Sequence, residues 1–214
     1  VTSKILSICE GSVATRGEVD KQKLIEQQAD YFLPPAGNPY GFTLTIKDNV
    51  MIPSAGIDES NIEGRYVLWP RDARGSANAV WRHLRRRGVR KVGVIITDSR
   101  SAPLRWGVTG VCIAHCGFRA LWNRAGTPDI FGRELRVTRV NVADGLAAAS
   151  VLVMGEGNEQ TPMAAIKDVP FVSFLDREPS EQELREQRIS IDEDLYGTLL
   201  KGVEWRKGGG GTHG

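Results

Sequence analysis

The sequence predicts an α+β fold (mixed α/β), with mixed sheets against which helices pack. Short apolar runs of strand character alternate with segments of helical periodicity, and a tight hairpin interrupts that alternation. A chain of 214 residues with 41% hydrophobic residues can bury a substantial core. We therefore expect a single unit over residues 1–207, built as one body or as two intertwined subdomains. A flexible, glycine-rich tail is expected at 208–214.

The first half of the chain contains strand-like runs and two helical segments. Lys47, Asp48 and Asn49 lie between two apolar runs and indicate a hairpin turn. Ser76 is a good cap for a helix whose apolar residues recur at helical spacing. The expected elements are, in order, a strand at 1–10 that closes on Gly11, a helix at 20–32, a hairpin at 42–52, a strand at 66–69 and a helix at 76–87.

The second half supplies the central strands and a buried helix. Residues 144–154 are almost wholly apolar, as a buried helix would be. Ser180 and Glu183 have the spacing of a capping box. The expected elements are strands at 92–97, 109–117, 136–142 and 163–166, and helices at 144–154, 180–188 and 192–201.

Composition argues against several classes of function. The formal net charge of +2 gives no overall attraction to nucleic acid, and no apolar run approaches the 18 residues of a membrane span. The helix at 76–87 carries a basic face, but no aromatic side chains interleave for stacking on bases, so a solvated face is the favoured interpretation. Three cysteines without a secretion signal indicate reduced thiols. We expect a cytoplasmic protein without nucleic-acid or membrane partners.

Cys112, His115 and Cys116 are close enough in sequence to suggest a metal site. In a regular strand, however, the two cysteines share one face and His115 points to the other. The compact four-ligand set of a structural zinc site is absent from this stretch. Core packing is therefore the favoured interpretation of these three residues.

Polar oxygen-bearing side chains gather where apolar runs end. Such oxygens suit Mg²⁺ or Mn²⁺, and glycines beside them would let the backbone approach phosphate oxygens. The chain has no Walker loop and no dinucleotide-binding glycine motif. The alternatives are a metal–phosphate enzyme or capped turns that merely satisfy strand ends. The three groups are Asp58 and Asn61; Asp98 and Ser99; and Glu156, Asn158, Glu159 and Gln160, with glycines at 56, 155 and 157.

These segments also resemble a known family. The stretches at 54–61 (SAGIDESN), 95–99 (IITDS), 131–135 (FGREL), 141–144 (NVAD) and 152–155 (LVMG) are similar, in this order, to the signatures of the coenzyme F420-0:L-glutamate ligase family. The resemblance covers residues 1–166. The longer forms GIDESN and MGEGNEQTP resemble a bacterial branch labelled as a folate-metabolism γ-glutamate ligase.

The resemblance implies a ligase, usually a homodimer, that uses GTP or ATP and two Mg²⁺ or Mn²⁺ ions. It would join L-glutamate to a carboxylate of an F420-0-type or folate-type acceptor through an acyl phosphate. The implied metal ligands are Asp58, Asp98, Ser99 and Glu156. The implied nucleotide contacts are Ser3, Lys4 and Asn61, and we add the glycine-bearing loop of Gly155, Gly157 and Asn158. Lys4 and Arg105 are candidates for binding phosphate or carboxylate during catalysis, and a structural salt bridge is the alternative for Arg105.

The chain departs from the family pattern at some positions. Ser99 stands where a threonine is usual, Glu156 where a glutamine is common, and Ile8 where a basic residue is frequent. The resemblance also implies a glycine-bearing nucleotide segment ahead of Val1, which this sequence does not include. A non-catalytic nucleotide- or flavin-binding relative, or a ligase for another amino acid, is the competing hypothesis.

Overall fold

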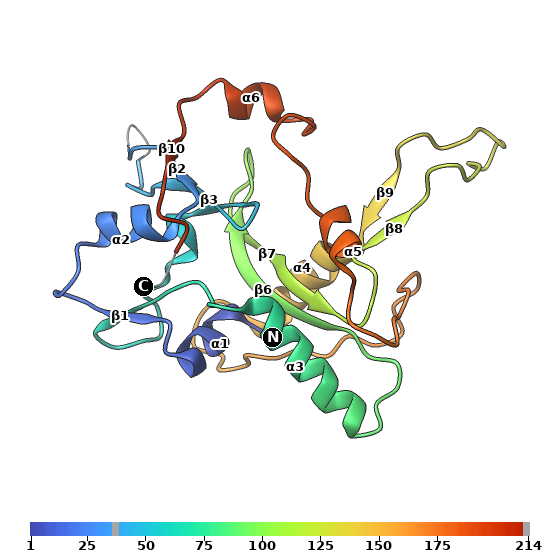
Figure 1. Ribbon diagram of the computed structural model, residues 1–214, viewed down its shortest axis with the longest axis horizontal. Coiled ribbons are helices and arrows are strands. Elements are labelled where there is room, and N and C mark those ends of the chain that lie inside the picture. The colour runs from blue at the N-terminus through green and yellow to red at the C-terminus, as the bar shows by residue number, and fades with distance from the viewer. Residues whose placement is uncertain (36–38, 212–214) are drawn as a thin grey trace.

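The computed structural model describes residues 1–35 and 39–211, and it confirms the α+β class (Figure 1). The helices of this part are α1 (Ser3–Glu10), α2 (Lys21–Gln28), α3 (Ala73–Arg86), α4 (Val142–Met154), α5 (Glu181–Glu186) and α6 (Gly197–Lys201), with a 3-10 turn η1 (Ser54–Gly56). The strands are β1 (Val13–Thr15), β2 (Tyr31–Phe32), β3 (Leu44–Lys47), β4 (Val50–Pro53), β5 (Arg65–Val67), β6 (Val94–Ser101), β7 (Val108–Cys116), β8 (Leu121–Asn123), β9 (Arg139–Asn141) and β10 (Arg206–Lys207). These strands form one four-stranded sheet and three two-stranded sheets in the described chain, and neighbouring strands in each sheet pair antiparallel. Parallel pairing occurs in isolated bridges such as that of Thr2 with Thr97.

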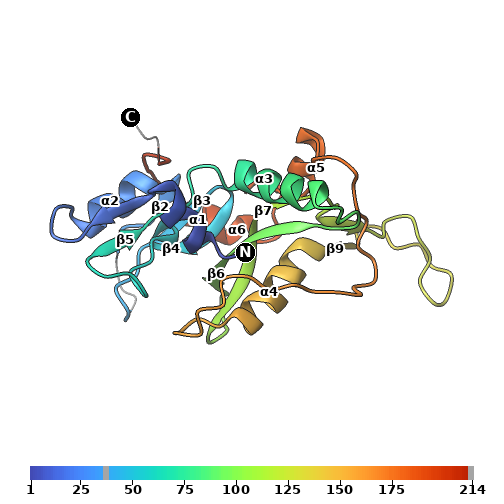
Figure 2. The ribbon, with the colours of Figure 1, turned by 90° about the horizontal axis from the view of Figure 1, so that it is seen from below.

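The long hairpin of β6 and β7 is the centre of the molecule. Figure 2 shows α3 on one side of this hairpin and α4 on the other. Small residues allow the close approach of α4, because a Cβ at Gly110 would lie 2.3 Å from the carbonyl oxygen of Ala147. The predicted strands at 92–97 and 109–117 and the predicted apolar helix are therefore confirmed in kind, and the three form a layered core.

A β-bulge in this hairpin overturns the prediction that Cys112 and Cys116 share a face. Ile96 pairs with Ala114 and Thr97 with Cys112, so Ile113 has no partner across the ladder. The extra residue reverses the alternation of side chains. Cys112 consequently packs in the cluster beneath α4, whereas Cys116 packs in the cluster beneath α3.

A four-stranded sheet in the order β10-β2-β3-β4 forms a second body beside the hairpin (Figure 1). The predicted turn is confirmed, since Asp48 and Asn49 both have positive φ, as a tight hairpin turn requires. The start of the expected tail is held to α2 and the residues after it: Gly208 donates to the carbonyl of Asp30, and Gly211 to that of Gln27, both at 2.9 Å. Residues 212–214 lie outside the described residues.

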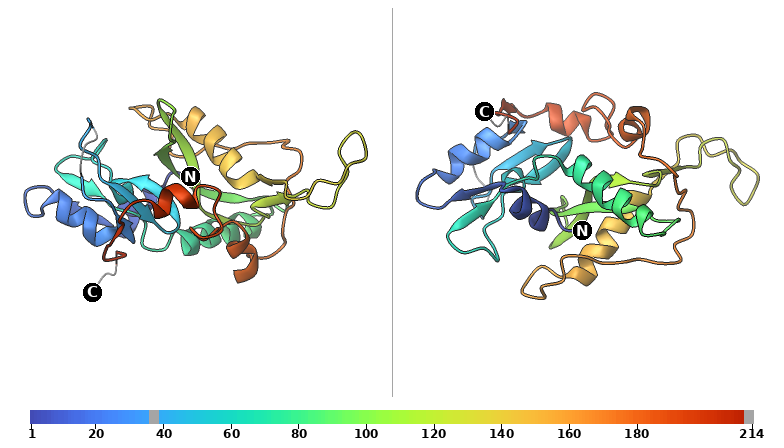
Figure 3. Two further views of the ribbon diagram at one scale, coloured as in Figure 1. Left: turned by 90° about the horizontal axis from the view of Figure 1, so that it is seen from above. Right: turned by 60° about the horizontal axis from the view of Figure 1, so that its bottom comes forward.

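Strands β8 and β9 form the base of an arm that leaves the body of the molecule. Both views of Figure 3 show the segment 124–138 extending away from the remaining elements. Its tip carries apolar side chains, with Ile130 92% and Phe131 76% exposed. The predicted strand at 136–142 is shortened to Arg139–Asn141, and Asn141 then caps α4 by accepting from Asp144 N at 3.0 Å.

The predicted strand at 1–10 is wrong, because residues 3–10 form helix α1. The isoleucines favoured a strand, but Ser3 and Ser7 are buried four residues apart and Leu6 packs toward α3. One face of a helix therefore meets the core. Gly11 ends the helix with a φ of 70° and donates to the carbonyl of Ile8 at 3.2 Å.

Other predicted elements change in length or disappear. Helix α2 ends at Gln28, because the following residues turn extended and enter β2. Helix α3 begins at Ala73, where Asp72 rather than Ser76 is the cap. The last helix starts at Gly197 instead of 192, while the capping box of Ser180 is confirmed. Residues 163–166 form no strand, because they lack a ladder partner.

Candidate functional site

A cavity of about 540 Å³ lies where four segments meet. These are the start of α1, the turn after β4, the middle of β6 and the loop after α4. The predicted metal and nucleotide residues all line it: Ser3, Lys4, Asp58, Asn61, Asp98, Ser99, Gly155, Glu156, Gly157 and Asn158. Segments separated by more than 90 residues in the chain thus supply one site.

The turn before Asp58 depends on an unusual backbone. Ser54, Ala55 and Gly56 all have φ between 53° and 70°, in the left-handed region. Gly56 is required there, because a Cβ at this position would lie 2.5 Å from the Trp69 ring. Asp58 then pairs with Val67 through two backbone hydrogen bonds, of 2.9 and 2.7 Å. This pairing fixes the backbone from which the Asp58 side chain enters the cavity.

Asp58 is held by an ion pair with Lys4. The Nζ atom of Lys4 lies 2.5 Å from Oδ2 of Asp58 and also donates to the Ser60 hydroxyl at 2.9 Å. The Ser60 backbone donates to Oδ1 of Asp58 at 2.6 Å. Burial would raise the pKa of Asp58, but the bonds from Lys4 and Ser60 outweigh it and lower the pKa below its usual value.

Asp98 is the most perturbed carboxyl group of the cavity. Its side chain accepts from Ser3 Oγ at 3.0 Å and from the Ser99 backbone at 2.7 Å. Burial, with smaller contributions from the negative charges of Asp58 and Glu156, raises the pKa of Asp98 to about 7. The ionised carboxylate therefore lacks enough positive charge around it in the protein alone.

Glu156 faces Asp98 across Ser99. The Ser99 hydroxyl donates to Oε2 of Glu156 at 3.3 Å. Burial raises the pKa of Glu156, while the bond from Ser99 and the charge of Lys4 partly oppose this. Asp98, Ser99 and Glu156 therefore form a continuous set of oxygen atoms along one wall.

The glycine-bearing loop after α4, which carries Glu156, borders the cavity. Gly155 ends α4 with a φ of 80°, and a Cβ there would lie 2.3 Å from Cδ of Glu159. Asn61 donates from Nδ2 to the Gly157 carbonyl at 2.7 Å, which ties this loop to the turn after β4. Asn158 is exposed at the rim of the cavity.

Arg105 does not line this cavity. It is exposed in the β6–β7 turn, and its guanidinium donates to the neighbouring Leu104 carbonyl at 3.1 Å. The cavity also contains Thr2, Thr97 and Thr161, which the sequence did not single out. Thr97 is buried and continues an apolar run, so only its position beside Asp98 indicates that it belongs to the site.

The donor set fits a hard divalent cation in its chemistry. Carboxylate and hydroxyl oxygens are the ligands that Mg²⁺ and Mn²⁺ prefer, and the raised pKa of Asp98 marks a carboxylate short of positive charge. Within residues 1–35 and 39–211, however, no three His, Cys, Asp or Glu side chains are grouped closely enough to hold a metal ion. The Lys4 ammonium instead provides the positive charge at Asp58.

Fold and site together define an α+β protein with an acidic cavity bordered by a glycine-bearing loop. Residues 1–168 match the model of the family described as F420-0:Gamma-glutamyl ligase. The chain belongs to this family.

Curated relatives named Coenzyme F420:L-glutamate ligase share part of the sequence. The protein of Methanothermobacter thermautotrophicus is 44% identical over 119 residues, which cover 55% of this chain and 47% of the relative. That of Archaeoglobus fulgidus is 42% identical over 149 residues, covering 69% of this chain and 57% of the relative. The chain spans about half the length of the curated relatives it matches. Among the described residues, no helix is both long and apolar enough to cross a bilayer.

Proposed function

We propose that the protein is a nucleoside-triphosphate-dependent γ-glutamyl ligase that acts in the cytoplasm. It joins L-glutamate to the carboxylate of an F420-0-type or a folate-type acceptor. Membership of the family supports the reaction class. The observation that carries the proposal is the single cavity that gathers Lys4, Asp58, Asp98 and Glu156 from separate family segments.

Two divalent ions, Mg²⁺ or Mn²⁺, are part of this proposal. Asp98, Ser99 and Glu156 would hold one ion, and Asp58 would join the second after Lys4 leaves its carboxylate. When bound, the ions supply positive charge that neutralises the triphosphate. Glu156 in place of a family glutamine adds one negative charge to this set, which favours a divalent cation over the ammonium group alone.

The chain's own residues position the phosphates. Lys4, once released from Asp58, reaches a phosphate oxygen as a mobile point charge. The backbone of Gly155 and Gly157 lets a phosphate approach closely. Attack of the acceptor carboxylate on the γ-phosphorus releases the nucleoside diphosphate and gives an acyl phosphate. The amine of L-glutamate then attacks the acyl carbon, loses a proton and displaces inorganic phosphate, which leaves the amide. The exposed Arg105 can serve this step only if a substrate or a second subunit reaches the β6–β7 turn.

Product analysis tests the proposal directly. The chain is incubated with L-glutamate, Mn²⁺ or Mg²⁺, GTP or ATP, and either an F420-0-type or a folate-type acceptor. Mass spectrometry is expected to detect a glutamylated acceptor that forms only when all components are present. An Asp58→Asn, Asp98→Asn double variant should lose this product, whereas Asp192→Asn, an exposed carboxyl group far from the cavity in sequence, should retain it.

Calorimetry with GTP and ATP in the presence of Mn²⁺ distinguishes a ligase from the competing hypothesis of a non-catalytic nucleotide-binding relative. Nucleotide binding without any glutamate-dependent product in the full set of acceptors would identify a non-catalytic binding relative. Unchanged turnover in the double variant would refute the metal assignment while leaving the ligase reaction in place.

We further propose that the protein is a homodimer. The arm of residues 124–138 exposes Ile130, Phe131 and Val137, of which Val137 is 85% exposed. Apolar side chains at the end of an extended arm are costly unless another surface covers them. Light scattering of the wild type and of a Phe131→Ser, Ile130→Ser variant tests this, and a monomeric wild type would refute it.

A further inference from the structure

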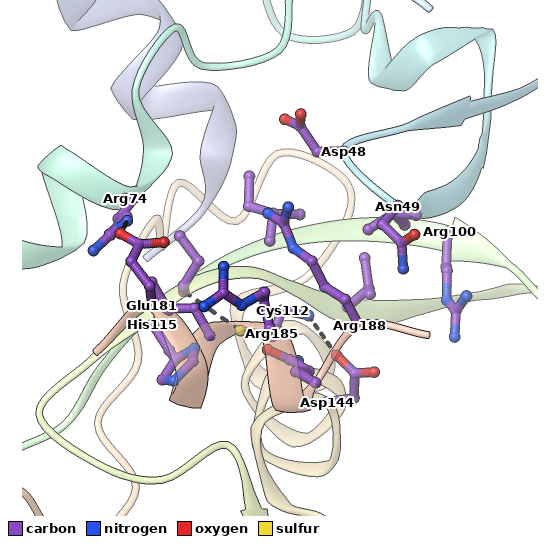
Figure 4. A pocket seen from close by; sticks show the side chains of 16 residues that line it. Asp48, Asn49, Arg74, Arg100, Cys112, His115, Asp144, Glu181, Arg185 and Arg188 are labelled. Atoms are coloured by element: carbon purple, nitrogen blue, oxygen red, sulfur yellow. Dashed lines mark hydrogen bonds and ion pairs between the residues drawn. The ribbon is translucent and has the colours of Figure 1, made fainter. Parts of the chain in front are cut away.

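A second cleft lies beside β7 and helix α5. It has a volume of about 240 Å³ and shares no lining residue with the acidic cavity. Neighbouring residues of β6 serve the two sites, because Ser99 lines the acidic cavity and Arg100 lines the cleft. The cleft is bounded by β7, the turn after β3, the start of α4 and helix α5 (Figure 4).

Two buried nitrogen atoms in this cleft have no hydrogen-bond partner among residues 1–35 and 39–211. They are Nε2 of His115, a residue only 2% exposed, and Nε of Arg100. A buried donor without a partner costs about 1–3 kcal/mol, so native proteins rarely leave one unsatisfied. Burial lowers the pKa of His115 to about 4, so its ring is neutral at pH 7 and can donate a proton from Nε2 to an oxygen acceptor.

The carboxylates of the cleft already have donors. Asp144 accepts from the Cys112 backbone at 2.9 Å and from Asn141 at 2.8 Å, and Glu181 forms an ion pair with Arg74 at 2.5 Å. Asp48, the third carboxyl group of the cleft, accepts from Nε1 of Trp69 at 2.7 Å. These carboxylates therefore have hydrogen-bond donors, and only Glu181 is paired with a cation of the described chain.

Four arginines face these three carboxyl groups in the cleft, and three of the arginines have no ion-pair partner within the residues that the structure describes. Arg100, Arg185 and Arg188 line the cleft, and none of them forms an ion pair with another residue in the described part of the chain. Figure 4 shows Arg185 and Arg188 in the middle of the view, Arg100 toward one end and His115 toward the other. Donors from β6, from β7 and from α5 with the residues after it thus line one cleft.

We propose that this cleft binds a small dicarboxylate. The planar guanidinium fork matches a carboxylate, and donors at separate points of the cleft suit a ligand with an anion at each end. The volume corresponds to about eight water molecules at about 30 Å³ each, which suits a molecule of amino-acid size. The inference does not rest on the ligase reaction.

Isothermal titration calorimetry without nucleotide or metal tests the inference. The probes are glutarate, its neutral diamide glutaramide, and inorganic phosphate. Glutarate is expected to bind at pH 7, glutaramide not to bind, and phosphate to bind at least tenfold more weakly. Arg100→Gln and Arg188→Gln should each weaken glutarate binding at least tenfold, because each removes a charge-assisted contact.

Two control variants locate the effect. Arg86→Gln removes an exposed arginine at the end of α3, and Lys4→Gln alters the acidic cavity, so both should keep the wild-type affinity for glutarate. Thermal melts check that each variant is folded. Absence of glutarate binding, unchanged affinity in both arginine variants, or phosphate binding as tight as glutarate would overturn the proposal. If the chain shows no ligase turnover but binds glutarate with the expected loss of affinity in the arginine variants, the proposal of a dicarboxylate site is supported and the proposed ligase function is refuted.

Discussion

Replacing Asp98 by asparagine should change how the stability of the metal-free protein depends on pH. The side chain of Asp98 has a pKa of about 7 in the folded protein, against 3.8 for an ordinary aspartate. Between these values the folded chain keeps a proton that the unfolded chain has released. The favourable contribution of this proton is therefore complete below pH 3.8 and is lost as the pH rises to 7.

The size of the effect follows from the two pKa values. Each pKa unit corresponds to about 1.4 kcal/mol, so the difference amounts to roughly 4 kcal/mol as an upper bound. In a chain of this size, such a change moves the melting temperature by about 10 °C. An amide at position 98 does not ionise, so Asp98→Asn should lack this slope and gain stability relative to wild type between pH 4 and 8.

Urea denaturation with a chelator present, at half-unit steps from pH 4 to 8, measures this difference. The pH–stability curve of wild type must be subtracted from that of Asp98→Asn, because His115 changes the stability of both proteins with pH in the opposite direction. Its pKa of about 4 means that stability falls as the pH drops below 6.5, and this contribution is common to both proteins. Asp192→Asn, at a carboxyl group 84% exposed, serves as the control and should show a flat difference.

A flat difference between Asp98→Asn and wild type would refute the reasoning. It would mean that Ser3 and the Ser99 backbone stabilise the carboxylate enough to offset its burial. A difference that rises with pH, but disappears when Mn²⁺ is added, would show that the cation supplies the missing positive charge.

Gly56→Ala should destabilise the fold by about 2–4 kcal/mol in urea denaturation, because the added Cβ would overlap the indole ring of Trp69. The control Gly64→Ala is also at positive φ but in open space, and it should destabilise the fold by about 1 kcal/mol. Glu183→Gln should have a lower free energy of unfolding than wild type, with the largest difference above pH 4.5. The difference should shrink as the pH falls toward 2, as denaturation at a series of acid pH values would show. An arginine hydrogen bond lowers the Glu183 pKa to about 2, and Glu186→Gln, exposed on the same helix, should behave like wild type. Gly145→Ala lies inside α4 with no atom within 4 Å of the new Cβ, so its melting temperature should rise with a gain of about 1 kcal/mol, and a fall would contradict the packing of α4.

The sequence predicted the central layers because their patterns are strong. The apolar runs around β6 and β7 and the apolar stretch of α4 have the composition of buried elements, whatever their neighbours. The first ten residues were misassigned, since their isoleucines favour a strand while only tertiary contact decides which side chains are buried. No local sequence pattern predicts the bulge at Ile113 either. This bulge places Cys112 and Cys116 on opposite faces of the hairpin.

The candidate site was predictable in its segments but not in its pairings. Polar residues at the ends of apolar runs indicated Asp58, Asp98 and Glu156 as a group. Nothing in a local pattern tells that Lys4 lies 2.5 Å from Asp58, or that Ser3 donates to a carboxylate 95 positions away. The arginine-lined cleft cannot be predicted from the sequence, because Arg185 and Arg188 have the pattern of an ordinary charged helix and only the fold brings Arg100 and His115 into the same cleft.

The two sites meet on one strand, where adjacent positions belong to different sites. Thr97, Asp98 and Ser99 of β6 line the acidic cavity, and Arg100, the next residue, lines the cleft. Side-chain alternation does not separate the opposite charges, because Asp98 and Arg100 are two residues apart and therefore share a face of the strand. Arg100 nevertheless forms no ion pair with a carboxylate of the described residues. An Arg100 that paired with the acidic cavity would neutralise the carboxylates proposed to hold divalent ions. Because Arg100 contributes to the neighbouring cleft instead, the acidic cavity keeps the excess of negative charge that divalent ions would neutralise.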